Sequence, residues 1–284
     1  MRDETFMTLM RLLPKSALST LVGKATRAPA PRAIHRMAIR AFAKSYKVNA
    51  EEAERPLDQY ETFAAFFTRK LKAGIRPIDP DPRAVVSPVD GAVSQIGYAE
   101  SGMIVQAKGV TYPVAKLLGD EEAAKAFDGG AFATLYLSPR DYHRIHFPVA
   151  GEIEGYSYIP GAFWPVNPAS VRGVPNLFAL NERLTTYLRT PSAGRVAVVA
   201  VGATNVARIR ASYDDLGVTH QGAAAKTHRY PAPLKSIQKG DELGVFEMGS
   251  TVILLFETGK IRWNSHLHPE AVVKMGQRIA LTNA

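Results

Sequence analysis

The sequence pattern of the second part of the chain is typical of a β-rich structure. From about Val85 onward, short runs of β-branched and aliphatic residues are separated by glycine and proline, as in residues 132–138 (FATLYLS), 195–203 (RVAVVAVGA) and 250–257 (STVILLFE). Apolar runs of this length, bounded by turn residues, predict β-strands. The sequence therefore predicts many short strands that pack as antiparallel sheets.

The first part reads as helical. Residues 1–55 predict two or three helices with a break at Pro29 and Pro31, and residues 63–72 (FAAFFTRKLK) predict a short helix that ends before Gly74. Helices followed by a run of strands are typical of an α+β fold. We expect a helical N-terminal unit over 1–55 and a β-rich unit over 56–284.

The formal net charge of +9 is partly concentrated in the N-terminal unit. Four basic residues recur every four positions and would form one stripe on a helix: Arg32, Arg36, Arg40 and Lys44. The opposite register is apolar: Ile34, Met37, Ala38, Ala41 and Phe42. Two interpretations stay open, a helix lying in a lipid interface and an ordinary helix with its apolar side on the core. No apolar stretch approaches the ~20 residues of a spanning helix, and no nucleic-acid-binding motif accompanies the charge.

Metal binding is not expected. Cysteine is absent, which removes thiolate ligands, disulfides and a thiol nucleophile. Two histidine pairs remain, His143 with His146 and His266 with His268, but neither lies in a His-Glu-x-x-His motif or has a carboxylate at ligand spacing. No role is assigned to the second pair.

A helix is expected around the first histidine pair. Ser138 and Pro139 resemble a helix cap and the first helical position. One helical turn would then bring His143 and His146 to the same side.

Near the C-terminus, the segment FEMGSTVILLFE (residues 246–257) interrupts an apolar strand with Gly249 and Ser250. A serine-hydrolase elbow would need a second glycine after the serine, and none is present. The bond between Gly249 and Ser250 can itself be reactive, because the serine hydroxyl can attack the preceding carbonyl and convert the amide to an ester. Asp90 and His146 are available as carboxylate and base, although spacing alone does not pair them with Ser250.

Several segments together resemble the bacterial phosphatidylserine decarboxylases, a pyruvoyl-dependent, membrane-associated family. EMGSTVILLFE is similar to the family's processing site, with Met248 where the usual pattern has leucine. Six further segments resemble the family in the same order: 66–79 (FFTRKLKAGIRPID), 87–93 (SPVDGAV), 108–119 (KGVTYPVAKLLG), 137–151 (LSPRDYHRIHFPVAG), 175–183 (PNLFALNER) and 201–206 (VGATNV). The resemblance covers most of residues 60–260.

The resemblance implies a self-cleaving proenzyme. Asp90, His146 and Ser250 match the family's cleavage triad, with His146 as the base and Asp90 orienting it. Cleavage between Gly249 and Ser250 would release a large chain, 1–249, and a small chain, 250–284, whose first residue becomes a pyruvoyl group. No external cofactor and no metal would be needed.

The resemblance also implies the reaction. The pyruvoyl group would form a Schiff base with phosphatidylserine, carbon dioxide would leave, and His143 would protonate the resulting carbon to give phosphatidylethanolamine. The expected setting is a homodimer of processed protomers, peripheral on the cytoplasmic side of the anionic cell membrane. Two alternatives remain: a decarboxylase of another serine-headed lipid such as archaetidylserine, and a non-catalytic module that binds lipid surfaces.

Overall fold

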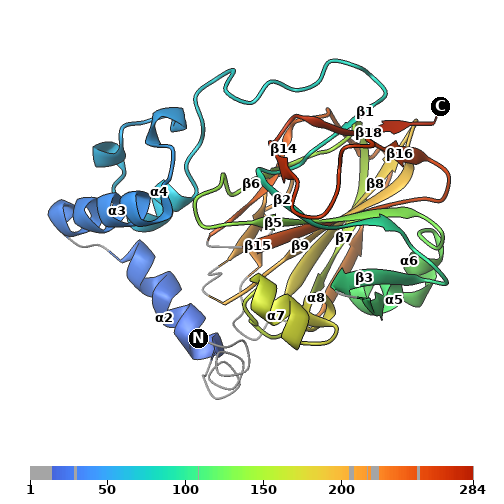
Figure 1. Ribbon diagram of the computed structural model, residues 1–284, viewed down its shortest axis with the longest axis horizontal. Helices are drawn as coiled ribbons and strands as arrows, with labels where there is room; N and C mark the ends of the chain where they lie inside the picture. The colour runs from blue at the N-terminus through green and yellow to red at the C-terminus, as the bar shows by residue number, and fades with distance from the viewer. Residues whose placement is uncertain are drawn as a thin grey trace.

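The computed structural model describes residues 15–28, 31–107, 109–204, 208–215, 217–218, 224–247 and 250–283. Within these ranges a helical lobe lies to one side of a β-rich body, and a long connection joins the lobe to the first strand (Figure 1). Every pair of named strands is antiparallel. The expected α+β class is confirmed. The expected division at residue 55 stays a prediction.

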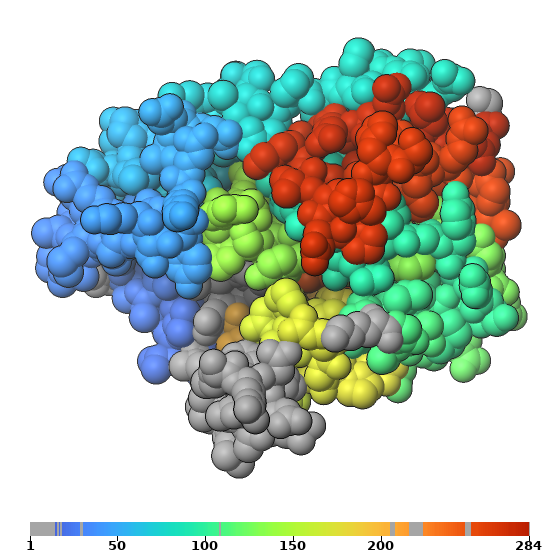
Figure 2. All heavy atoms as spheres, viewed as in Figure 1, coloured from blue at the N-terminus to red at the C-terminus, as the bar shows by residue number. Residues whose placement is uncertain are grey.

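The lobe contains helices α2 (Lys15–Arg27), α3 (Arg32–Tyr46) and α4 (Phe63–Phe67), with short 3-10 turns at η1 (Ala50–Glu52) and η2 (Leu57–Gln59). It has its own small core, formed by Ile39, Ala43, Tyr60, Phe63, Phe66 and Phe67. In the space-filling view the lobe (blue) stands beside the body (Figure 2). Among the described helices, none has the length and apolarity needed to cross a membrane.

Of the two interpretations of α3, the one that packs the apolar register of Ile34 and Met37 on the core does not hold. The helix buries His35, Ile39 and Ala43 against the lobe, whereas Ile34 and Met37 are 52% and 69% exposed. The buried side is the one that faces the phenylalanines of α4, and Phe42 packs beside them. Apolar and basic side chains therefore share the outer surface of this helix, where Arg32, Arg36 and Lys44 are also exposed.

Helix α4 is shorter than the predicted 63–72. It ends at Phe67, and the next residues take tertiary partners in place of helical ones. Arg69 Nη2 donates to the carbonyl oxygens of Arg140 and Asp141 at 3.0 and 3.4 Å. Leu71 forms a bridge with Ala53. Tertiary contacts, of Arg69 with the body and of Leu71 within the lobe, thus outweigh the helical tendency of this segment.

The main sheet of the body has the order β12-β7-β8-β9-β15-β5-β2-β17, and β13 also pairs with β7. Its strands are β2 (Gly91–Tyr98), β5 (Ala131–Leu137), β7 (Gly151–Ile159), β8 (Arg183–Thr190), β9 (Gly194–Val201), β12 (Lys226–Arg229), β13 (Lys235–Ile237), β15 (Ser250–Phe256) and β17 (Val272–Val273). The strand predicted near 250–257 is confirmed as β15.

Smaller elements cover the two faces of this sheet (Figure 1). On one side lie β1 (Ala84–Val86), β18 (Arg278–Thr282) and β16 (Ile261–Trp263), which form a three-stranded sheet. A separate four-stranded sheet has the order β11 (Gly217–Val218), β10 (Ile209–Ala211), β14 (Glu242–Phe246) and β6 (Arg144–His146). On the other side lie β3 (Met103–Ala107), β4 (Val110–Pro113), α5 (Val114–Leu118), α6 (Glu121–Lys125), α7 (Pro168–Gly173) and α8 (Leu177–Leu180).

Strand β15 lies in the middle of the main sheet, between β5 and β9. Val252, Ile253 and Leu254 have no exposed surface. Full burial of such side chains contributes about 1.5–3 kcal/mol each. The start of this strand is therefore held firmly where the sheet meets the elements that cover it.

Candidate active site

Strands β15 and β2, which lie on either side of β5, bring two of the predicted residues to the same end of the main sheet's strands. Ser250, the first residue of β15, lies opposite Leu137 at the end of β5. On the other side of β5, Ala92 at the start of β2 lies opposite Tyr136. Asp90 immediately precedes β2, so its backbone lies two strands from position 250. Met248, Gly249 and the side chain of Ser250 lie outside the described part of the structure.

Gly91 allows the approach that positions Asp90. A Cβ atom on residue 91 would lie 2.4 Å from the backbone oxygen of Tyr136, closer than such atoms come in proteins. Only glycine lets β2 begin this close to β5. The Asp-Gly pair is therefore part of a strand start and more than a plain surface turn.

The Asp90 carboxylate is almost completely buried and fully engaged. It accepts hydrogen bonds from Arg76 Nε at 2.9 Å and Nη2 at 2.6 Å, from Lys274 Nζ at 3.2 Å and from the Met275 N–H at 2.9 Å. Burial alone would raise the pKa of this carboxyl, but Arg76, the Met275 N–H and Lys274 outweigh burial and hold its pKa below the usual range. Asp90 is thus a fixed negative charge.

Sequence reasoning missed the residues that hold Asp90. Arg76 also pairs with Glu52 of the lobe through its Nη2 at 2.6 Å, so a chain of charges runs from the lobe into the site. Arg76 lies within the family-like segment 66–79, but that segment contains other basic residues and gives no reason to prefer this one. Lys274 lies beyond the segments that resemble the family.

His146 has partners on both ring nitrogens. Nδ1 lies 2.7 Å from the carbonyl oxygen of Gly240, which requires a proton on Nδ1, and the Tyr142 hydroxyl lies 3.1 Å from Nε2. Burial lowers the pKa of the imidazole, so the neutral ring is favoured, with the lone pair on Nε2. Neither nitrogen is bonded to Asp90. The two residues are joined through the backbone, where the His146 N–H donates to Pro88 O at 2.9 Å.

His143 lies between the lobe and the body. Its ring packs on Phe67 of α4 with the ring centres 4.1 Å apart, and Nδ1 lies 2.8 Å from the carbonyl oxygen of Asp141. Nε2 is buried without a hydrogen-bond partner in the described part of the chain. Burial lowers the pKa of this imidazole to about 3, so the ring is neutral near pH 7. A backbone hydrogen bond connects His143 to the strand that precedes Gly249 and Ser250, because the Phe246 N–H donates to His143 O at 3.0 Å.

The helix predicted from Ser138 and Pro139 is wrong. Asp141 Oδ2 accepts hydrogen bonds from both the N–H and the hydroxyl of Ser138, at 2.8 and 2.7 Å, and closes a single turn. The chain then enters β6, which pairs with β14. Residues three apart in extended backbone point to opposite sides. His143 and His146 accordingly have separate surroundings, which suits separate roles.

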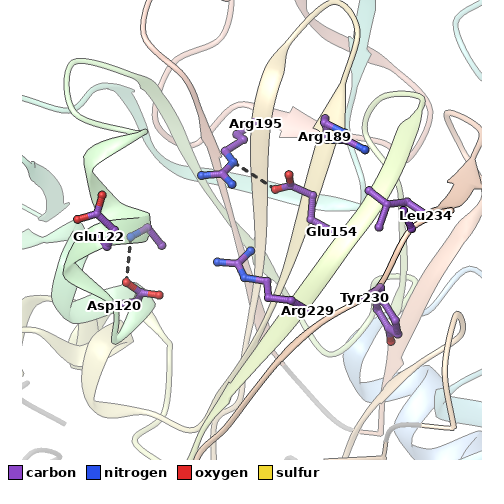
Figure 3. A pocket seen from close by; sticks show the side chains of 10 residues that line it. Asp120, Glu122, Glu154, Arg189, Arg195, Arg229, Tyr230 and Leu234 are labelled. Atoms are coloured by element: carbon purple, nitrogen blue, oxygen red, sulfur yellow. Dashed lines mark hydrogen bonds and ion pairs between the residues drawn. The ribbon is translucent and has the colours of Figure 1, made fainter.

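A pocket of about 340 Å³ borders the end of these strands. The residues that line it include Ala92, Tyr136, Val166, Val171 and Arg172. Another hollow, of about 470 Å³, lies at the opposite end of the strands (Figure 3). There Arg195 pairs with Glu154 at 3.2 Å, and Arg189 and Arg229 are nearby. This second hollow contains none of the predicted site residues.

The described residues contain no cluster of histidine and carboxylate side chains suited to a metal ion. His266 is exposed, and His268 Nδ1 lies 2.8 Å from the adjacent Pro269 carbonyl oxygen. Neither contributes to the arrangement around Asp90.

Comparisons with known proteins identify the family of the chain. The family model described as phosphatidylserine decarboxylase matches residues 63–281, and a second model, named PSD, matches residues 5–47. The phosphatidylserine decarboxylase proenzyme of Myxococcus xanthus (strain DK1622) is 60% identical over 281 residues, which cover 99% of each chain. The proenzymes of Anaeromyxobacter sp. (strain K) and Brevibacillus brevis are 56% and 43% identical, with 98% and 97% of each chain covered. The chain therefore belongs to the phosphatidylserine decarboxylase family.

Proposed function

We propose that this protein is a proenzyme that cuts itself between Gly249 and Ser250 and then converts phosphatidylserine to phosphatidylethanolamine. The observation that carries the proposal is the strand register, which places position 250 and the residue after Asp90 on the two sides of the end of β5, together with the backbone hydrogen bond from the buried His146 to Pro88, two residues before Asp90. Membership of the family supports the same activity.

Self-cleavage needs a base, and His146 is the proposed one. Its Nε2 lone pair accepts the proton of the Ser250 hydroxyl, and the serine oxygen attacks the Gly249 carbonyl carbon. The protonated imidazole then returns this proton to the nitrogen of residue 250 as the C–N bond breaks, which leaves an ester and a free amine. Loss of the α-proton of residue 250 then expels the Gly249 carboxylate by β-elimination. Hydrolysis of the resulting dehydroalanine releases ammonia and leaves a pyruvoyl group. Burial lowers the pKa of His146, and the fixed charge of Asp90 acts against burial by favouring the protonated imidazole.

The described residues fit a pyruvoyl group at position 250. The first residue of β15 is held by pairing with β5, and the following residues are buried, so the group would be rigidly placed in a dry site. Such a group supplies a ketone that captures the head-group amine and accepts the electrons released with carbon dioxide. His143 then delivers a proton to the carbon that has lost carbon dioxide. The substrate's own carboxylate and phosphate favour protonation of this buried ring.

The test of this proposal is the mass of the purified protein. We expect two chains, residues 1–249 and residues 250–284, with the small chain blocked at its N-terminus by pyruvoyl. Incubation with a phosphatidylserine should release carbon dioxide and yield phosphatidylethanolamine. A protein that stays one chain and only binds lipid would be a binding module, and one that prefers a serine-headed ether lipid would have a different substrate.

We further propose that the lobe attaches the enzyme to anionic membrane, because a two-tailed substrate does not leave the bilayer readily. The exposed side chains of Leu21, Ile34 and Met37 provide apolar contact. The exposed Arg32, Arg36 and Lys44 beside them provide attraction to anionic head groups. Arg40 is partly committed elsewhere, since it pairs with Asp58 at 2.8 Å.

Replacement of Arg32, Arg36 and Lys44 by glutamine should weaken binding to vesicles that contain phosphatidylserine. Each basic residue near the surface contributes about 1 kcal/mol, so the loss is roughly a hundredfold at low salt. The measurement is vesicle sedimentation at two salt concentrations. The matched control replaces the exposed Lys125, Lys260 and Arg262 by glutamine, which removes the same amount of charge at positions far from the lobe. Equal losses in both triple variants, or equal losses of turnover on vesicles and on a short-chain soluble substrate, would contradict the proposal.

A further inference from the structure

Glu182 is a buried carboxyl that the steps above do not use. The residue is 1% exposed, and its Oε2 accepts a hydrogen bond from the Tyr158 hydroxyl at 3.0 Å. Its Oε1 is buried with no hydrogen-bond partner in the described part of the structure. A buried polar oxygen without a partner costs free energy. Its presence calls for an explanation other than stability.

The register of the main sheet places Glu182 near position 250. Val201 of β9 lies opposite both Arg183 of β8 and Thr251 of β15. The pairing continues one residue further, because the Gly202 N–H donates to the Glu182 carbonyl oxygen at 2.8 Å. Positions 182, 202 and 250 therefore form one row across three strands. At ~4.8 Å per strand, the two outer backbones are about 10 Å apart.

The middle position of this row is a glycine. A Cβ atom on residue 202 would lie 3.9 Å from the Glu182 Cβ and 3.9 Å from Phe163 Cε1. Because glycine has no side chain, the space between Glu182 and position 250 is not filled from the strand that separates them. This spacing suits a small head group that reaches both ends of the row.

The backbone around Glu182 is fixed by its neighbours. The Glu182 N–H donates to Ala162 O at 3.0 Å. The preceding Asn181 uses its side-chain amide to donate to the carbonyl oxygens of Trp164 and Gly202, at 2.9 and 2.8 Å. The carboxyl therefore has a set place relative to the end of β9, as a group that positions a substrate requires.

We propose that Glu182 binds the ammonium group of the lipid head group and accepts a proton from it. The inference rests on the proposed function, in which that amine attacks a ketone at position 250. An N–H bond of the ammonium breaks, its electron pair stays on nitrogen as the lone pair needed for attack, and the proton bonds to Oε1. The proton returns to the amine when the product leaves as an ammonium ion.

The electrostatics of the site suit this transfer. Burial raises the pKa of the Glu182 carboxyl to about 7, against the hydrogen bond from Tyr158, which favours the carboxylate. Tyr158 of β7 is the titratable group that contacts it. The neighbouring segments 162–164 and 202–203 contain no titratable side chain, and the Arg183 guanidinium is bonded to the carbonyls of Lys116, Leu117 and Asn181. Because its pKa is raised, the Glu182 carboxylate is a stronger base than a carboxylate at the protein surface.

The first test measures amine capture without decarboxylation. Processed wild type and Glu182→Gln are incubated with short-chain phosphatidylethanolamine and cyanoborohydride, and the mass gain of the small chain is followed at pH 7. We expect both proteins to be fully cleaved and to contain pyruvoyl. Capture should be 10²–10⁴-fold slower in Glu182→Gln, the range for loss of a general base. The control Glu152→Gln, which changes a partly exposed carboxylate far from position 250, should capture at the wild-type rate.

The second test is the pH dependence of turnover on a short-chain phosphatidylserine. In the wild type kcat/KM should rise through pH 7 as Glu182 loses its proton. In Glu182→Gln the rise of kcat/KM through pH 7 should disappear. The difference in kcat/KM between the variant and the wild type should become smaller as the pH approaches the pKa of the free amine, about 10. In Tyr158→Phe the carboxyl remains but loses a bond that favours its anion. Its pKa then rises, and the ascending limb should move to higher pH.

The outcomes separate this inference from the proposed function. A wild-type protein without a cleaved, pyruvoyl-blocked small chain would refute the proposed function itself. Normal cleavage with unchanged amine capture in Glu182→Gln would overturn only the role of Glu182. Loss of cleavage in Glu182→Gln, or an unmoved limb in Tyr158→Phe, would also overturn it, because the carboxyl would then serve maturation or structure.

Discussion

Ser250→Ala is expected to yield a single uncut chain of 284 residues with no decarboxylase activity. Alanine has no nucleophile, so neither the ester nor the pyruvoyl group can form. The measurement is denaturing electrophoresis and intact mass, followed by release of carbon dioxide from labelled phosphatidylserine. Activity should fall to background, because the variant lacks the reacting group itself.

The control for this variant is Ser236→Ala, which removes an exposed hydroxyl from β13 and should be cleaved normally. The Ser250→Ala protein should also keep its fold, since residue 250 pairs with Leu137 through its backbone. Efficient cutting of Ser250→Ala at the same bond would refute the proposed mechanism.

The two histidines are expected to fail at different stages. His146→Ala should remain uncut, because the base that activates Ser250 is missing. His143→Ala should be cut but should decarboxylate 10²–10⁴-fold more slowly, the usual range for loss of a general acid–base group. Each variant is assayed first for the small chain and then, where cut, for turnover on a soluble short-chain substrate.

The structure gives a physical reason for this division. The His146 Nε2 lies 3.1 Å from the Tyr142 hydroxyl and Nδ1 is held by Gly240 O, whereas the His143 ring packs on Phe67 and has an Nε2 without a hydrogen-bond partner among the described residues. His268→Ala, which changes an exposed ring, should be normal in both assays. If His143→Ala also remains uncut, the two rings share the cleavage step and the division is wrong.

The parts of the fold that could be predicted from the sequence are those set by local patterns. The run Val252–Phe256 is long, apolar and partly β-branched, and such a run favours a buried strand in almost any context. The two helices on either side of Pro31 follow from the proline break and the four-residue spacing of basic residues. These signals lie within a few residues of one another.

The errors arose where distant residues decide the local structure. The cap-like Ser138 is bonded to Asp141, and β6 then forms because β14, about a hundred residues later, supplies its partner. Helix α3 has apolar residues on more than one side, and only the position of α4 determines which of them are buried.

The candidate site was predicted unevenly for the same reason. The candidates Ser250, Asp90, His143 and His146 were predicted through segments that resemble a family, and their roles stay predictions. Arg76 and Lys274, which bind Asp90, come from segments far apart in the sequence, and no local pattern singles them out. Glu182 was within a family-like segment, but its value as a base follows from burial and from the glycine beside it, which only the folded sheet reveals.

The ion pairs from Glu52 through Arg76 to Asp90 connect the lobe to the candidate site in the body. We therefore expect the lobe and the body to be retained together in evolution. A lineage that lost the lobe would also lose one of the two carboxylates that neutralise Arg76, close to Asp90, which is proposed to support self-cleavage. A different membrane anchor could therefore be gained in addition to this lobe. It could replace the lobe only after another acidic residue had taken over the ion pair of Glu52 with Arg76. The means of reaching the lipid and the means of making the cofactor are expected to evolve together.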